Sequence, residues 1–95
     1  MQGVSRALIE EVKFNKTRIT SNDWSTYPIL RFKEAPLLTT TVVQRLDKPS
    51  TGAGEPALAP VAAAIANAFF DATGKRIRTA PMTAARVRAA LAASA

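Results

Sequence analysis

The sequence predicts an α+β fold, with a few short strands and two or three helices packed against something larger. A β-branched run spans Leu37 to Leu46, and an alanine-rich pattern with helical spacing spans Pro60 to Thr73. The length of 95 residues allows one domain at most. A chain this short has a marginal core unless a partner completes it. We therefore expect residues 1–95 to form a single partial domain.

The composition is that of a folded protein, because hydrophobic residues make up 47% and charged residues 21% of the chain. The absence of cysteine and histidine excludes disulfides, thiolate metal sites and Ser-His or Cys-His nucleophiles within this chain. The net charge of +6 comes from residues spread between Arg6 and Arg88, without interleaved aromatic rings. A solvated surface or an acidic partner fits this spread better than nucleic acid. No segment is expected to reach the apolar length of about 18 residues that spans a membrane.

The first third of the chain predicts a helix, a hairpin and a loop. A helical apolar stripe near the start predicts a helix that ends near Glu11. Alternation over residues 12–14, a turn at Asn15 and a return over 17–20 predict a short hairpin. A polar loop follows, and we expect its aromatic residues to pin it to a core. The stripe consists of Val4, Ala7 and Leu8, and the aromatic residues are Trp24 and Tyr27.

The segment from Leu37 to Leu46 predicts a strand, because threonine and valine favour the pleated sheet. Its alternation places two sets of side chains on opposite faces. One face carries Leu38, Thr40, Val42, Gln44 and Leu46, and the other carries Leu37, Thr39, Thr41, Val43 and Arg45.

The last third predicts two helices. The first runs from Pro60 to Thr73, and Gly74 is placed to cap its C-terminus. Thr83 can serve as the N-cap of a last helix, from Ala84 to about Ala92. The positions expected to face inward are Val61, Ile65, Ala68, Phe69 and Ala72 in the first helix, and Val87 and Leu91 in the second.

A glycine turn between strand and helix, Gly52-Ala53-Gly54-Glu55-Pro56, delivers a lone carboxylate to the start of a helix. It does not meet the requirements of a dinucleotide fingerprint, because residues 47–51 separate it from the strand. Pro56 lacks a backbone donor, and Glu55 would repel a pyrophosphate. Two interpretations of Glu55 stay open on spacing alone. It is either a catalytic base or a structural residue near a helix start, where the dipole favours an anion.

Several ordered motifs resemble the C-terminal end of the large molybdenum-cofactor subunit of the xanthine dehydrogenase/aldehyde oxidase family. The detail is most similar to the bacterial branch that hydroxylates N-heteroaromatics such as isoquinoline or nicotinate. The motifs are Gln2-Gly3-Val4-Ser5-Arg6-Ala7-Leu8, Tyr27-Pro28-Ile29-Leu30-Arg31, Glu34-Ala35-Pro36, Gly52-Ala53-Gly54-Glu55-Pro56, the alanine-rich helix from Pro60 to Ala68, Asp71-Ala72-Thr73-Gly74-Lys75-Arg76-Ile77-Arg78 and Pro81-Met82-Thr83.

The resemblance implies that Glu55 is the active-site base, with Gly52 and Gly54 next to the cofactor and no metal ligand on this chain. The reaction would add water-derived oxygen to a carbon of an N-heteroaromatic or an aldehyde. The implied cofactors are molybdenum–molybdopterin, shared with a missing upstream part or partner, and iron–sulfur clusters on a partner subunit. The basic residues Lys75, Arg76 and Arg78 are interpreted as structural or subunit contacts.

Because the family subunit is several times longer, we expect this chain to be a C-terminal piece of a molybdopterin-binding domain. Its expected partners are the remaining molybdopterin-binding polypeptide and an iron–sulfur subunit, with no nucleic acid. Alone it should be inactive, and a non-catalytic fragment or interaction module without cofactor is the alternative. Cytoplasmic and periplasmic locations are both open.

Overall fold

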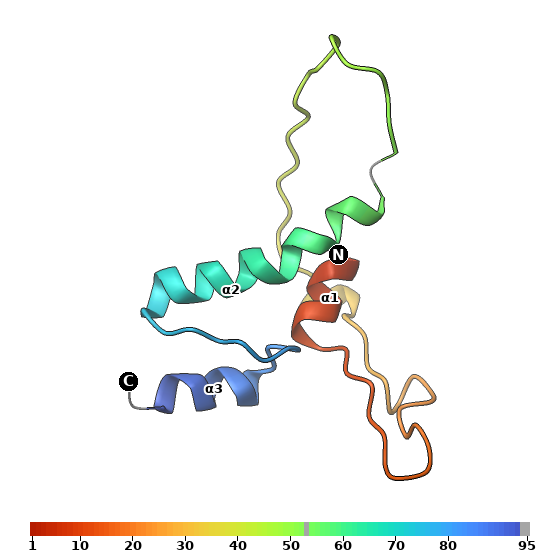
Figure 1. Ribbon diagram of the computed structural model, residues 1–95, viewed down its shortest axis with the longest axis vertical. Helices are drawn as coiled ribbons and strands as arrows, with labels where there is room; N and C mark the ends of the chain where they lie inside the picture. The colour runs from red at the N-terminus through yellow and green to blue at the C-terminus, as the bar shows by residue number, and fades with distance from the viewer. Residues whose placement is uncertain (53, 94–95) are drawn as a thin grey trace.

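The computed structural model describes residues 1–52 and 54–93, which form three α-helices and two single 3₁₀ turns. Figure 1 shows α1 standing across the N-terminal end of α2, with α3 below α2 and a long arm of chain projecting away from the helices. The helices are α1 (Gln2–Leu8), α2 (Ala59–Thr73) and α3 (Ala84–Ala92), and the 3₁₀ turns are η1 (Phe32–Glu34) and η2 (Glu55–Ala57).

The core lies where α1 meets α2 and the segment that precedes α3. Its buried apolar side chains are Ala7, Ile77 and Met82, and half-buried residues of α2 and α3 pack around them. The backbone amide of Met82 donates to the carbonyl of Ala7 over 2.7 Å, which ties the two ends of the chain together. The described side chains around this core are Leu8, Ile65, Ala66, Phe69, Val87 and Ala90.

The two C-terminal helices confirm their sequence predictions. α2 begins one residue before the predicted Pro60 and ends at Thr73. Gly74 takes the left-handed conformation, φ 69°, that favours glycine at a helix C-cap, and its amide bonds to the carbonyl of Phe70. Thr83 caps α3 by accepting a hydrogen bond from the amide of Arg86.

Some predicted inward positions were wrong. Ala68 and Ala72 are exposed, because α2 contacts the core through Ile65, Ala66 and Phe69. Leu91 is 44% exposed, because the short core ends before the last turn of α3.

The first helix ends at Leu8, earlier than the predicted Glu11. The two acidic residues that follow are drawn to partners elsewhere in the chain. Glu10 accepts a hydrogen bond from the Tyr27 hydroxyl, and Glu11 forms an ion pair with Arg86. These tertiary partners override the local helical pattern.

The predicted hairpin over 12–20 is reduced to a single antiparallel bridge between Phe14 and Ile19. The turn itself is present: the Asn15 side chain accepts hydrogen bonds from the amides of Thr17 and Arg18. Both bridge residues are exposed, so no buried face extends the pairing.

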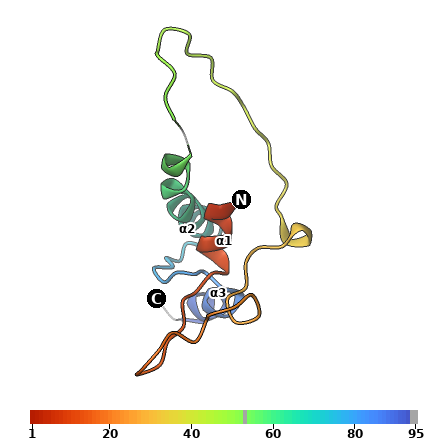
Figure 2. The same ribbon diagram turned by 90° about the vertical axis from the view of Figure 1, so that its right-hand side faces the viewer.

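The predicted strand at 37–46 has no strand assignment in the described structure. It forms one leg of the exposed arm, which stands clear of the helices in both views (Figures 1 and 2). A strand needs a neighbour for its ladder of hydrogen bonds, and the described residues supply none here. The α+β fold class stays a prediction.

The expectation that no apolar segment reaches membrane-spanning length was wrong. The helical stretch Glu55–Thr73 is 19 residues long, and its length and composition alone would allow it to cross a membrane. It reaches this length because η2 continues into α2. Its many alanines equally suit a helix that packs closely against other protein.

The chain exposes far more surface than a globular protein of its mass. Its accessible area is 8022 Å², whereas a folded monomer of this size exposes about 5,300 Å². Its radius of gyration is 16.7 Å, against about 12 Å for a compact domain of this length. The chain therefore buries less of its surface than a compact domain of this length.

Replacing Gly3 with alanine should destabilise the contact between α1 and α2. A Cβ at Gly3 would lie 2.7 Å from Val61 Cγ2 and 2.9 Å from its Cβ. We expect the free energy of unfolding to fall by about 1 to 2 kcal/mol, because overpacking outweighs the better helix propensity of alanine. Thermal unfolding followed by circular dichroism measures this loss. Gly52→Ala is the control, since nothing lies within 4 Å of its added Cβ. Equal stability of both variants would contradict the close approach.

The isolated chain should be expanded in solution and bind a hydrophobic dye. We expect small-angle X-ray scattering to give a radius of gyration near 16.7 Å. Phe32→Ser should reduce dye fluorescence without loss of helix content, because Phe32 is 98% exposed. A radius near 12 Å with no dye binding would contradict the structure.

Candidate functional site

Glu55 is the first residue of η2, and its carbonyl accepts a hydrogen bond from the amide of Leu58 over 3.0 Å. Gly54 precedes it as the N-cap with φ −69°, a conformation open to any residue. A Cβ added at Gly52 or Gly54 would meet nothing within 4 Å. The turn is therefore open on the side of its glycines, with room for another surface. Ala53 lies outside the described residues.

Glu55 shares an open hollow of about 430 Å³ with the start of α1. The close approach of Gly3 to Val61 brings these elements together. Gln2 is therefore the polar neighbour of Glu55 that the sequence reasoning did not assign to the site. The sequence feature that could have pointed to Gln2 was its position in the motif that spans residues 2–8. The lining residues are Met1, Gln2, Gly3, Gly54, Glu55, Ala57, Leu58 and Val61.

The described residues do not form a complete metal or cofactor site. They contain no group of three histidine, cysteine, aspartate or glutamate side chains that could hold a metal. Glu55 and Gly54 are exposed, whereas a small-molecule site usually encloses most of its ligand. The described residues thus offer a single exposed carboxylate at the turn and do not enclose a ligand.

A second, larger hollow of about 730 Å³ lies between α1 and the loop that follows it. Two hydrogen bonds fix its wall: the Leu30 amide donates to Ser5 Oγ over 2.9 Å, and the Tyr27 hydroxyl donates to Glu10 Oε2 over 2.8 Å. The bond to Glu10 raises the pKa of Tyr27. Tyr27 thus pins the loop as expected, whereas Trp24 is 74% exposed and does not.

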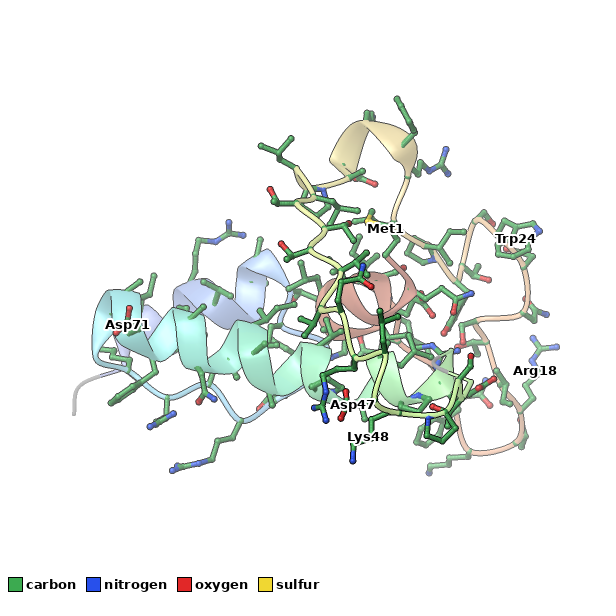
Figure 3. All side chains as sticks on the ribbon, turned by 90° about the horizontal axis from the view of Figure 1, so that it is seen from above. Met1, Arg18, Trp24, Asp47, Lys48 and Asp71 are labelled. Carbon is green, nitrogen blue, oxygen red and sulfur yellow. The ribbon has the colours of Figure 1, made fainter. Side chains whose placement is uncertain are left out.

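The two hollows adjoin at the start of α1. In Figure 3, Trp24 and Arg18 lie on the loop at one end, Asp71 lies at the far end of α2, and Met1 lies between them. Met1 and Gln2 line both hollows. The start of α1 is therefore the element that links them.

The basic cluster after α2 has structural partners. Lys75 Nζ donates to the carbonyl of Leu91 over 2.8 Å, near the C-terminus of α3. Arg76 donates to Asn67 Oδ1 over 3.1 Å, and its guanidinium lies 3.6 Å from the ring centroid of Phe70. These contacts support the structural interpretation of Lys75 and Arg76.

Comparison with known proteins finds two oxidoreductase subunits and an aldehyde dehydrogenase. The chain is 50% identical over 91 residues to a nicotinate dehydrogenase subunit of Pseudomonas putida, covering 96% of this chain and 8% of that protein. It is 34% identical over 82 residues to the beta subunit of isoquinoline 1-oxidoreductase from Brevundimonas diminuta, covering 86% and 10%. It is 33% identical over 85 residues to a membrane-bound aldehyde dehydrogenase of Gluconacetobacter polyoxogenes, covering 90% and 11%, whose name specifies pyrroloquinoline quinone.

These similarities support the relationship to a molybdenum hydroxylase family that the motifs indicate. The chain spans only 8%, 10% and 11% of the length of these relatives. No protein-family model matches the chain, and no solved structure matches it.

The loop beside the larger hollow depends on the ionised carboxylate of Asp23. Its Oδ1 accepts hydrogen bonds from the amides and hydroxyls of Ser25 and Thr26, at 2.6 to 2.9 Å. These bonds, that of the Ser25 hydroxyl first, lower the pKa of Asp23 from 3.8 to about 2. The folded turn thus binds its proton less readily than the unfolded chain does.

Stabilisation of this turn by Asp23 should be fully present above about pH 4 and lost as the pH falls towards 2. Trp24 fluorescence, measured against pH, should report the change. Asp23→Asn should remove the transition, and Asp71→Asn, at an exposed position on α2, should leave it unchanged. A transition that persists in Asp23→Asn would refute the role of this carboxylate.

Proposed function

We propose that this chain forms one wall of the active site of a molybdenum hydroxylase and supplies its catalytic base, Glu55. The enzyme would oxidise an N-heteroaromatic or an aldehyde. In this proposal the chain corresponds to the C-terminal part of the molybdopterin-binding subunit. The remaining molybdopterin-binding polypeptide and an iron–sulfur subunit complete the enzyme. The names of the relatives support an oxidoreductase of this type.

One observation carries the proposal. Two motifs of the resemblance, distant in sequence, line the same hollow: Gln2-Gly3 at the start of α1 and Gly54-Glu55 at the turn. If Glu55 only stabilised the start of a helix, it would not need to lie beside the start of α1. The close contact at Gly3 gives the turn a defined neighbour on this chain.

The proposed role of Glu55 is to accept a proton during the hydroxylation. A positioned carboxylate can act as a general base when it lies within hydrogen-bond reach of the proton that it removes. The molybdenum cofactor, when bound, supplies the oxidising capacity. Gly52 and Gly54 would let another surface approach the backbone of the turn, since no side chain fills that space.

Catalysis requires that another polypeptide cover the turn. Glu55 is exposed in this chain, and a closed site excludes water from the reacting groups. The same exposure favours a second candidate, an interaction module without cofactor. Molybdenum and pterin analysis of the assembled protein separates the two, and quinone analysis tests the cofactor specified in the name of the third relative.

Glu55→Gln in the reconstituted complex should lower turnover by about 10² to 10⁴-fold, because the amide cannot accept the proton. Molybdenum content should be unchanged, since Glu55 is not proposed as a metal ligand. Steady-state turnover and metal analysis on the same preparation measure both. Asp71→Asn is the control, because Asp71 lies at the far end of α2 from the turn (Figure 3). Full turnover in Glu55→Gln would rule out the role of Glu55 as the base.

A further inference from the structure

We propose that residues 37–46 are a docking strand that pairs with an exposed β-sheet edge of the remaining molybdopterin-binding polypeptide. This inference rests on the proposed function, because that function supplies the partner. The segment is one leg of the arm that stands away from the helices in two perpendicular views (Figures 1 and 2).

The backbone of the segment is free to pair. In the part of the chain that the structure describes, residues 37–44 take part in no backbone hydrogen bond. Ten residues in extended conformation span roughly 33 Å. The run is rich in threonine and valine, which favour a sheet. Sequence preference and unpaired backbone therefore coincide in the same segment.

The apolar side chains of the segment are exposed on both of its faces. Leu38, Val42 and Leu46 share one face and are 61%, 73% and 94% exposed. The opposite face carries Leu37 and Val43, which are 97% and 78% exposed. Apolar residues on both faces are typical of a strand that is covered on both sides.

The segment lacks the features that keep a free strand from associating. Natural edge strands are commonly guarded by charged residues or proline. Arg45 is the one charged residue between positions 37 and 46, and it pairs with Asp47 at 2.7 Å. Prolines occur only outside the segment, the nearest being Pro36 and Pro49. An unguarded strand of this kind is suited to permanent coverage.

A larger polypeptide is a better occupant than a second copy of this chain. The described residues contain no sheet, so a second copy could offer only another lone arm. An isolated two-stranded ribbon is marginal in water, and two copies carrying +6 each would repel. The excess surface of the chain, about 2,700 Å² above a globular protein of its mass, is of the size that permanent interfaces bury.

Docking of this strand would also position the catalytic turn. Residues 47–52 follow the segment in sequence and lead to the turn that carries Gly54 and Glu55. Holding residues 37–46 on a partner sheet fixes one end of this stretch, and the contact between α1 and α2 fixes the other. The docking strand is therefore a positioning element for Glu55.

The test is co-expression of the full chain with a defined probe. The probe is the matching nicotinate dehydrogenase subunit of Pseudomonas putida, truncated to remove the region that this chain matches. We expect the two polypeptides to co-purify, and hydrogen exchange should show new protection of the amides within residues 38–46. Failure to co-purify, or co-purification without protection there, would overturn the proposal. Protection in the chain alone, together with dimerisation, would identify a second copy as the occupant and also overturn it.

Proline substitutions provide the matched variants. Successive amides of a strand point to opposite edges, so Val42→Pro and Val43→Pro each remove a different potential ladder bond. At least one of them should weaken the complex on the order of tenfold or more. Lys16→Pro, in an exposed turn outside the arm, should have no effect, and Val42→Thr should retain pairing with reduced affinity. Wild-type affinity in both Val42→Pro and Val43→Pro would refute strand pairing.

Glu55→Gln separates this inference from the proposed function. It should co-purify like the wild type, because Glu55 is not part of the docking strand. If it also retains turnover, the catalytic role fails while docking stands. If both proline variants bind normally while Glu55→Gln is inactive, docking fails while the catalytic role stands.

Discussion

The close approach of α1 to α2 is the contact on which the rest of this structure depends. It is possible because position 3 lacks a side chain: a Cβ there would lie 2.7 Å from Val61. Further along, α1 forms hydrogen bonds with two other parts of the chain. Ser5 holds the following loop at Leu30, and the carbonyl of Ala7 holds the segment before α3 at Met82. A helix of seven residues thus joins α2, the loop at Leu30 and the segment before α3.

The same contact gives Glu55 its surroundings. η2 continues into α2, so the position of Glu55 follows from the packing at Val61, and the start of α1 becomes its neighbour. The remaining side of the turn is open at Gly52 and Gly54. Glu55 therefore lies on an exposed turn that borders the start of α1 on one side and is open on the side of its glycines.

The elements that could be predicted from sequence are those that local chemistry determines. Gly74 and Thr83 mark helix ends through their own conformation and hydrogen bonds, and α2 and α3 lie within one residue of their predicted starts. The early end of α1 could not be predicted, because it depends on distant partners of Glu10 and Glu11. Glu55 and its glycines could be named from the motif. Its proximity to Gln2 could not, because it arises from tertiary packing.

The unpaired segment at 37–46 is a different kind of discrepancy. Its residues favour a strand as clearly as those of α2 favour a helix, but a helix satisfies its own backbone, whereas a strand requires a neighbour. In the described structure, the helices that satisfy their own backbone hydrogen bonds are formed, whereas residues 37–46, which need a neighbouring strand, have no strand assignment. The conflict between sequence preference and described structure therefore marks the segment that the proposed partner would pair with. In the proposed assembly, residues 47–51 link this segment to the turn that carries Glu55, so docking of the strand and covering of the turn would be coupled.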